Sequence, residues 1–250
     1  MIRIKKLVQL AFVFLLVFLS SCTHRKNDLS REHLMGKVKS IEELYHPVVN
    51  DTLGIKAFYA YNEDGNLVEK KVYSQNSLLY NILLVYTDKG KLTERNTYNA
   101  DSLQEKIKYN LADNGNILES IDYNLLSHSV IKFEYHYDNN GNPIEIDGWN
   151  SADSLKKIDT LKSLYQYDGK GNVIEEKHFD INGVPTYMQS LIYNDSNHII
   201  SAEVYAKANN PENQKLVYSY DFDKTNNWVK QRIFSNDTLV GIKTRVIEYY

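Results

Sequence analysis

The chain repeats one pattern of apolar and polar positions seven times. Each copy is built around a glycine or an asparagine, here called the anchor, and successive anchors are 25, 25, 26, 30, 26 and 29 residues apart. The anchors are Gly65, Gly90, Gly115, Gly141, Gly171, Asn197 and Asn226. Glycine and asparagine adopt a positive φ most readily, so the pattern predicts a left-handed backbone conformation at each anchor.

Apolar or aromatic side chains stand four and six positions before every anchor. Four before are Tyr61, Tyr86, Leu111, Tyr137, Tyr167, Tyr193 and Phe222, and six before are Tyr59, Leu84, Tyr109, Tyr135, Tyr165, Leu191 and Tyr220. Because side chains alternate between the two faces of a strand, both sets lie on one face. Polar residues such as His136 and Asp221 stand between them, and an aromatic residue follows every anchor by eight positions, from Tyr73 to Phe234.

The residues around each anchor predict a tight turn between two strands. The segment Asp138 to Gly141 (DNNG) has its acidic residue first and its glycine fourth, as in a type I turn that continues into a β-bulge. Each copy is therefore a predicted β-hairpin. A second kind of turn joins successive hairpins, with the sequence NDTL at Asn50 to Leu53 and Asn236 to Leu239, and ADSL at Ala100 to Leu103 and Ala152 to Leu155.

These hairpins predict an all-β fold. Seven hairpins, a lone strand from Lys37 to Tyr45 and another from Ile242 to Tyr250 give an antiparallel meander of about sixteen strands. Helix is expected only around Ser30 to Met35. Since a flat layer would leave the apolar face wet, we expect a curled sheet or an open roll or barrel, and the sequence leaves open whether the sheet closes.

The predicted turn also sets a register between the two arms of each hairpin. The position six before the anchor should face the position four after it, which is Glu69, Glu94, Glu119, Glu145 or Glu175 in the first five copies. This register predicts a ladder of tyrosine–glutamate hydrogen bonds on the covered face. The alternative is that the bulge rotates the second arm and turns these glutamates toward solvent.

The Tyr-Asp-x-x-Gly-Asn core, seen at Tyr137 to Asn142, resembles the YD repeat of Rhs-type proteins. The sequence Leu-Ser-Ser-Cys ending at Cys22, together with GKVKSIEE from Gly36, resembles repeat-bearing bacterial lipoproteins. The resemblance covers about Gly36 to Tyr250. The chain departs from the pattern at Asn197 and Asn226, which replace glycine, and at Leu111, which replaces tyrosine. Large Rhs proteins wind such hairpins into a hollow shell around a toxin, and this array is expected to be too short to close such a shell.

The first residues have the pattern of a processing signal. Arg3, Lys5 and Lys6 precede an apolar run from Leu7 to Leu19, which is short for a membrane span. The run ends in Leu-Ser-Ser-Cys at Cys22, which resembles the lipobox of bacterial lipoproteins and implies cleavage before Cys22 and acylation of its thiol. Two or three acyl chains, at about 0.8 kcal/mol for each buried methylene, would anchor the protein almost permanently.

The chain thus divides into three predicted parts: a signal peptide over 1–21, a flexible tether over 22–33 and a repeat domain over 34–250. The tether prediction follows from the polar residues between Thr23 and Glu32, which show no apolar periodicity. The balance of 29 basic and 32 acidic residues gives no reason to expect nucleic acid as a partner. Cys22 is the only cysteine, so a disulfide framework is excluded.

The sequence predicts no catalytic, cofactor-binding or metal-binding residues. Asp138, Asn140, Asn142 and Glu145 lie close together, but the glycine is fourth rather than sixth, unlike an EF-hand calcium loop. The histidines show no zinc-site spacing; they are His24, His33, His46, His128, His136, His178 and His198. A Ser-His-Asp triad is not excluded by sequence order, but the chain has no Gly-x-Ser-x-Gly nucleophile elbow.

The expected function is therefore a non-catalytic one: a lipid-anchored β-repeat protein of the outer membrane that acts as a binding or structural scaffold for a protein or glycan partner. The alternative is an envelope hydrolase with an unrecognised site in a loop. The repeated tyrosines are interpreted as sheet-packing residues. Trp149, Trp228 and the loops at Asn150 to Lys157 and Ala206 to Asn213 are the better candidates for recognition.

Overall fold

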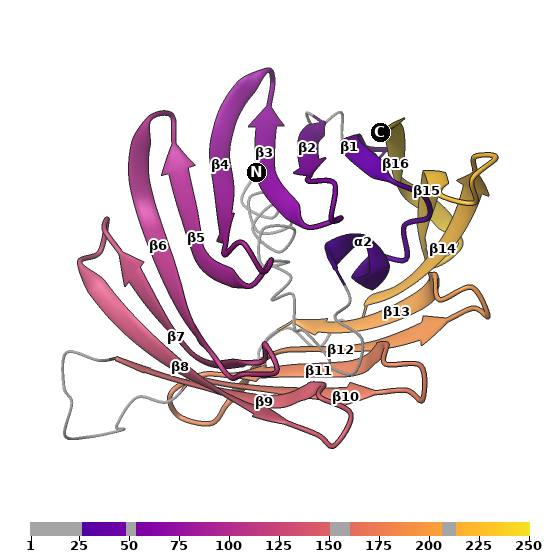
Figure 1. The fold of residues 1–250 in the computed structure, drawn as a ribbon. Coiled ribbons are helices and arrows are strands. Elements are labelled where there is room, and N and C mark those ends of the chain that lie inside the picture. The colour runs from indigo at the N-terminus through magenta and orange to yellow at the C-terminus, as the bar shows by residue number, and fades with distance from the viewer. Residues whose placement is uncertain (1–26, 49–53, 151–160, 207–213) are drawn as a thin grey trace.

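The computed structural model describes residues 27–48, 54–150, 161–206 and 214–250. These residues form a closed antiparallel β-barrel of sixteen strands (Figure 1). The first element is a four-residue helix, α2 (Asp28–Arg31). The strands are β1 (Val38–Pro47), β2 (Ile55–Tyr61), β3 (Leu67–Ser74), β4 (Ser77–Tyr86), β5 (Leu92–Asn99), β6 (Ser102–Leu111), β7 (Ile117–Asn124), β8 (Ser129–Tyr137), β9 (Pro143–Asn150), β10 (Leu161–Tyr167), β11 (Val173–Phe179), β12 (Pro185–Tyr193), β13 (Ile199–Ala206), β14 (Gln214–Phe222), β15 (Trp228–Ser235) and β16 (Thr238–Tyr249).

Every strand pairs with its neighbours in sequence, and β1 pairs with β16 to close the ring. The predicted antiparallel meander and its sixteen strands are confirmed. The two lone strands are each other's partners, in a register that runs from Ser40 opposite Glu248 to Pro47 opposite Gly241. The sheet therefore has no free edge among the described strands, which removes a common route to aggregation. The seven hairpins that were expected to be too few for an Rhs-type shell are enough to close a barrel.

The anchors have the predicted backbone conformation. Asn197 and Asn226 have φ values of 62° and 66°, and the five anchor glycines also have positive φ. In the fourth hairpin, the amide of Gly141 donates to the carbonyl of Asp138 at 3.1 Å, and the amide of Asp138 donates to the carbonyl of Asn142 at 2.8 Å. The Asp138 carboxylate accepts from the amides of Asn140 and Asn142, so the acidic residue holds the turn closed.

The tyrosine-rich face lines the inside of the barrel. Figure 1 shows α2 inside the ring of strands. Leu29 and Leu34, in and just after this helix, are buried and pack with Tyr61, Leu67 and Ile41. The contacts therefore place the residues four and six before each anchor toward the interior, and the positions between them on the outer wall.

The prediction of a flexible tether over 22–33 is wrong for residues 27–33. Asn27 caps α2 by accepting from the Ser30 amide at 2.9 Å, and the Asp28 carboxylate accepts from the Leu67 amide at 2.7 Å and from the Tyr86 hydroxyl at 3.1 Å. These polar residues thus have fixed partners on the barrel, which a search for apolar periodicity does not detect. The predicted helix region, Ser30 to Met35, lies two residues beyond the start of α2.

The predicted tyrosine–glutamate ladder is also wrong. The residue four after the anchor pairs with the residue five before it, as Glu69 does with Ala60, while Tyr59 pairs with Lys70. Each hairpin has a bulge at this point. The extra residue shifts the pairing of the second strand by one position, which exchanges its inward and outward side chains. The alternative interpretation was therefore correct in placing the glutamates on the outer wall.

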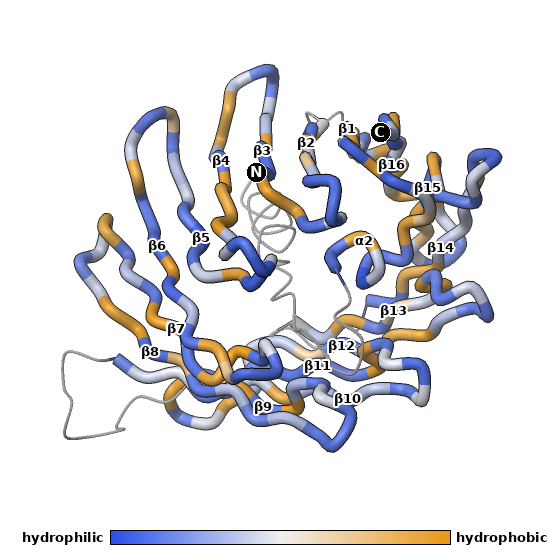
Figure 2. Tube along the Cα trace, in the orientation of Figure 1, coloured by the Kyte–Doolittle hydropathy of each residue, from blue (hydrophilic) through white to orange (hydrophobic). Residues whose placement is uncertain are grey.

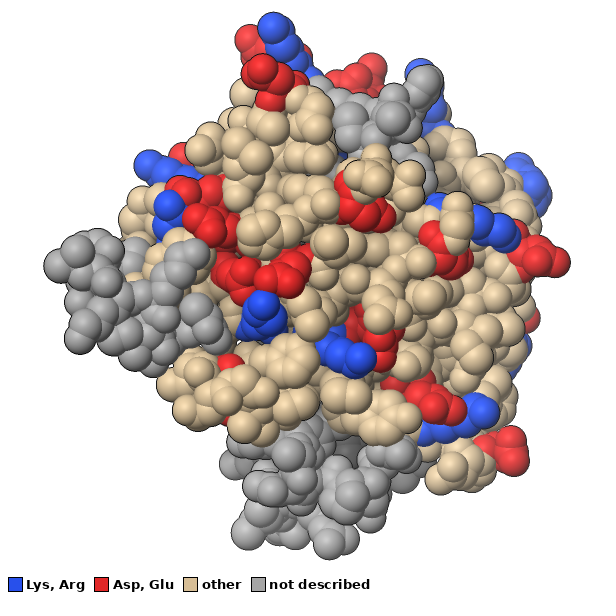
Figure 3. All heavy atoms as spheres, turned by 90° about the horizontal axis from the view of Figure 1, so that it is seen from below, with Lys and Arg blue, Asp and Glu red and all other residues tan. Residues whose placement is uncertain are grey.

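On the outer wall Glu94, Glu119 and Glu145 form ion pairs with neighbouring strands, whereas Glu69 and Glu175 pair with a lysine on their own strand. The pairs on this wall are Lys39–Glu248, Lys56–Glu42, Lys71–Glu69, Lys106–Glu94, Lys132–Glu119, Lys162–Glu145, Lys177–Glu175, Lys215–Glu203 and Arg232–Asp221. Figure 2 shows hydrophilic and hydrophobic stretches mixed along most strands, and Figure 3 shows acidic and basic side chains side by side on one wall. Ion-paired side chains therefore recur on the outer wall from hairpin to hairpin.

Candidate functional site

A polar network lies on the interior wall where β10, β11 and β12 run side by side. Ser163 on β10 is directly opposite His178 on β11, and His178 is opposite Tyr187 on β12. Glu176 is two residues before His178 on the same face, and it is opposite Gln189 on β12. The bulge after Gly171 places Glu176 and His178 inside and Glu175 outside.

The side chains of this network are joined by short hydrogen bonds. The Ser163 hydroxyl lies 2.7 Å from Nδ1 of His178, and Nε2 of His178 lies 2.7 Å from Oε1 of Glu176. The second Glu176 oxygen accepts from Nε2 of Gln189 at 2.6 Å, and the Tyr187 hydroxyl donates to Oε1 of Gln189 at 2.7 Å. With the carboxylate ionised, Nε2–H of the imidazole donates a hydrogen bond to Glu176, and the Ser163 hydroxyl donates one to the unprotonated Nδ1.

Two aromatic rings flank the histidine. The Tyr165 ring meets His178 edge to face, with the ring centres 6.2 Å apart, and the Tyr187 ring lies 5.6 Å from His178. Burial raises the pKa of both tyrosines, so both hydroxyls stay protonated at physiological pH. The His178 and Glu176 side chains nevertheless keep 29% and 20% of their surface exposed inside a closed barrel. Since a sixteen-stranded barrel has room for water, these groups are within reach of a solute.

A second polar group lies on the interior wall of β5, β6 and β7. The Arg95 guanidinium pairs with the Glu105 carboxylate, which also accepts from the Thr97 hydroxyl at 3.1 Å. Burial, with the nearby Glu105 charge, raises the pKa of Asp122 to about 6. The interior therefore offers charged and neutral hydrogen-bonding groups on two separated parts of its wall.

A third group of side chains joins β1, β15 and β16 on the interior wall, next to the end of α2. Glu43 on β1 accepts from Nε of Arg245 at 2.9 Å and lies 3.5 Å from Nζ of Lys243. Burial alone would raise the pKa of Glu43, but the charges of Lys243 and Arg245 lower it to about 2. The Arg245 guanidinium stacks 3.5 Å from the centre of the Trp228 ring, and the Tyr61 hydroxyl donates to Glu32 at 3.4 Å. These contacts pair charges and pack side chains within the barrel, which is a structural role.

The tyrosines four before the anchors also have a structural role. In four hairpins their hydroxyls donate to the carbonyl two residues after the preceding anchor. The bonds are Tyr86 to Leu67, Tyr137 to Ile117, Tyr167 to Pro143 and Tyr193 to Val173, at 2.8, 2.7, 2.8 and 2.9 Å. In the seventh hairpin Phe222 has no hydroxyl, and Tyr220 donates to Ile199 instead, at 2.6 Å. The repeated tyrosines thus join successive hairpins.

The other residues singled out in the sequence are distributed over both walls. Trp149 is on the outer wall with Lys132 5.7 Å from its ring centre, whereas Trp228 is inside beneath Arg245. Cys22 lies outside the described residues, and so does most of the two candidate loops.

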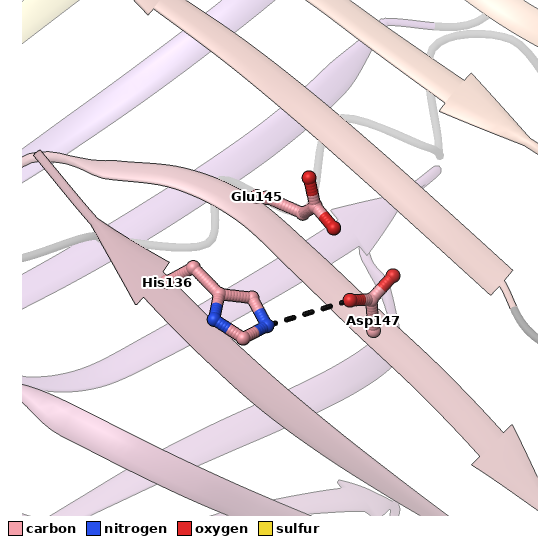
Figure 4. Close-up of side chains that lie close together, drawn as sticks. All are labelled: His136, Glu145 and Asp147. Carbon is pink, nitrogen blue, oxygen red and sulfur yellow. Dashed lines mark ion pairs between the residues drawn. The ribbon is translucent and has the colours of Figure 1, made fainter.

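One cluster on the outer wall has the residue types of a metal site. His136, Glu145 and Asp147 lie within 4.8 Å of one another (Figure 4). Nε2 of His136 is 3.4 Å from Asp147, and the Lys162 ammonium already contacts Glu145 at 2.6 Å and Asp147 at 3.6 Å. A shallow recess of about 290 Å³ lies elsewhere on this wall, beside Lys56 and Tyr73. Neither feature joins as many converging groups as the network around His178.

Sequence reasoning missed the interior network because of the bulge. The predicted register turned Glu175 inward, which left Glu176 and His178 on the outside. The signal that could have found them is the change of phase: after a bulge, the inward positions are two, five and seven after the anchor. Ser163 is two positions before Tyr165 and shares its face.

No protein-family model and no curated protein matches this chain. Solved structures that share its fold include two porin-like proteins. One is a porin-like protein from Bacteroides uniformis, 11% identical, with a TM-score of 0.58 over 86% of this chain and 99% of that chain. The other is a porin-like protein from Bacteroides vulgatus, 10% identical, with a TM-score of 0.51 over 85% and 98% of the two chains.

This likeness shows the fold alone: a closed meander barrel. Within the described part of the chain, no helix has the length and apolar character of a membrane span.

Proposed function

We propose that the protein is a non-catalytic binding protein of the bacterial cell envelope, anchored in the outer membrane through Cys22, whose barrel holds a hydroxyl-rich ligand such as a glycan in its interior. The observation that carries the proposal is the network of Ser163, Glu176, His178, Tyr187 and Gln189 on the interior wall. No nucleic acid or cofactor is part of the proposal.

The chemistry of this network suits a sugar. Carboxylate, amide and imidazole groups donate and accept hydrogen bonds in a plane, which matches the ring hydroxyls of a saccharide. The rings of Tyr165 and Tyr187 supply flat apolar surface next to these groups. The network is fixed by its own hydrogen bonds before any ligand arrives, so little side-chain entropy is lost on binding.

The outer wall supports a barrel that stays outside the bilayer. A transmembrane barrel carries an apolar band about 25 Å tall, and a lysine or arginine at its centre costs roughly 2–4 kcal/mol. In this barrel, Lys–Glu pairs occupy the outer wall of hairpin after hairpin. This wall also exposes aliphatic side chains such as Leu118, which directly precedes the Lys132-paired Glu119. An acyl anchor at Cys22 supplies membrane attachment without requiring the strands to enter lipid.

The binding proposal is tested with full-length protein in detergent micelles on an array of envelope glycans. Glu175 and Glu176 are adjacent in sequence, yet one pairs with Lys177 outside and the other with His178 and Gln189 inside. We expect Glu176→Gln to weaken glycan binding at least tenfold and Glu175→Gln to leave it unchanged. Failure of the wild type to bind any glycan, or an equal effect of both variants, would contradict the proposal.

The anchor is tested separately. The wild type should partition into detergent after phase separation, and Cys22→Ala should accumulate as the unprocessed precursor, because cleavage follows acylation of this thiol. Normal cleavage and membrane retention of Cys22→Ala would show that the protein is attached in another way.

A further inference from the structure

We infer that Ser163 is an activated nucleophile that takes up an acyl group from an activated ester. This reactivity goes beyond the proposed binding role, because it depends only on the groups around Ser163 and on their access to solvent. The inference rests on the chain of contacts from Ser163 to His178 and from His178 to Glu176, each 2.7 Å long.

The three side chains have the roles of nucleophile, base and orienting acid. A serine hydroxyl is a weak nucleophile until a neighbouring base removes its proton, and a histidine serves as that base when its second nitrogen is held by a carboxylate. Here Nε2 of His178 is held by Glu176, so Nδ1 accepts the Ser163 proton. The arrangement is recognised by geometry, and the elbow sequence sought in the chain is one of several ways to build it.

The groups around Ser163 hold the base in a fixed orientation. When His178 takes up the serine proton it becomes a cation. The Glu176 carboxylate lies beside this cation, and the rings of Tyr165 and Tyr187 lie next to it. Gln189 holds the other Glu176 oxygen, which keeps the carboxylate directed at the imidazole. Tyr165 is two residues after Ser163 on the same face of β10, and its ring lies next to His178.

The reaction is an acyl transfer. The bond from Oγ of Ser163 to the carbonyl carbon forms, and the bond from that carbon to the leaving oxygen breaks. The serine proton passes to Nδ1 of His178 and then to the leaving oxygen, so the products are an acyl-serine and a free alcohol or phenol. No oxidant, reductant or metal ion is needed.

The experiment measures covalent labelling of the full-length protein in micelles by a biotinylated fluorophosphonate, which forms the Oγ–P bond and expels fluoride. We expect Ser163 to be the labelled residue when peptides are analysed by mass spectrometry. Since proton transfer by a placed base contributes about 10²–10⁴-fold, His178→Gln should slow labelling at least 100-fold. Ser190→Ala, on the outer wall of β12, should leave the labelling rate unchanged.

The outcomes separate this inference from the binding proposal. Labelling of Ser163 at the same rate in wild type and His178→Gln, or no labelling of Ser163, overturns the inference and leaves glycan binding to be judged by the glutamate variants. Labelling that depends on His178 supports it. If p-nitrophenyl acetate releases more than one equivalent of nitrophenol for each Ser163, the inference stands and the non-catalytic part of the proposed function is wrong.

Discussion

Asparagine at two of the seven anchors shows which property of the residue the turn requires. Asn226 has a φ of 66° and is exposed, so its conformation rather than its packing determines what can replace it. Most L-residues in this conformation bring Cβ close to the following carbonyl oxygen, which costs roughly 1–2 kcal/mol.

We therefore expect Asn226→Ala to lower the free energy of unfolding by about 1 kcal/mol and Asn226→Gly to leave it unchanged or raise it. Urea unfolding of the two variants and the wild type under the same conditions gives the comparison. Equal loss of stability in both variants would mean that the asparagine side chain, not its backbone, is what the turn needs.

Two carboxyl groups in the barrel respond to pH in opposite directions. The pKa of Glu43 falls to about 2, because Lys243 and Arg245 outweigh the effect of burial, so folding favours its charged form. Its contribution to stability is present above pH 4.5 and is lost as the pH falls toward about 2. Burial raises the pKa of Glu32, so folding favours its protonated form, and this contribution is lost as the pH rises above 4.5.

At pH 7 we therefore expect Glu43→Gln to lower the free energy of unfolding by roughly 3 kcal/mol, since it leaves the largely buried Arg245 and the partly exposed Lys243 without their carboxylate. Glu32→Gln should raise it. The difference between Glu43→Gln and the wild type should shrink as the pH is lowered from 4.5 toward 2 in a series of urea titrations. A difference that does not change with pH would contradict the assigned ion pairs.

Among the elements, the hairpins are joined by tyrosine hydroxyls as well as by the strand ladder. The Tyr137 hydroxyl donates to the carbonyl of Ile117 in the preceding hairpin at 2.7 Å, where the bulge exposes that carbonyl to the interior. A single intramolecular hydrogen bond contributes about 1 kcal/mol.

Tyr137→Phe should therefore cost about 1 kcal/mol in the free energy of unfolding. Tyr123→Phe, on the outer wall of β7, is the matched control and should change it by less than about 0.5 kcal/mol. If the two substitutions have the same effect, the hydroxyl bonds do not join the hairpins.

The sequence predicted the hairpins, their number and the left-handed anchors, because each follows from residues close together in the chain. It could not predict which residues after the anchor face inward, since one extra residue in the bulge exchanges the two faces. For this reason the sequence did not predict that Glu176 and His178 face the interior. Nor could it place α2, because Asp28 is held by Leu67 and Tyr86, which are distant in sequence.

At the scale of the whole molecule, closure of the barrel separates two surfaces with different chemistry. The outer wall has ion pairs along and between its strands, and the interior has tyrosines and polar networks that keep part of their surface exposed. This distribution is the basis of the central claim: the barrel has water on both sides of its wall, and its ligand binds inside.

Thiol labelling tests this claim most directly, because Cys22 is the chain's only cysteine and its proposed acylation would leave the mature protein without a free thiol. Gln231→Cys places a thiol on the interior wall of β15, and Ser190→Cys places one on the outer wall of β12. With the protein in its native outer-membrane vesicles, opened so that both faces are accessible, we expect a small water-soluble maleimide to label both thiols. Labelling at Gln231→Cys alone would mean that lipid covers the outer wall, and labelling at Ser190→Cys alone would mean that the interior is closed to water; either result would contradict the account.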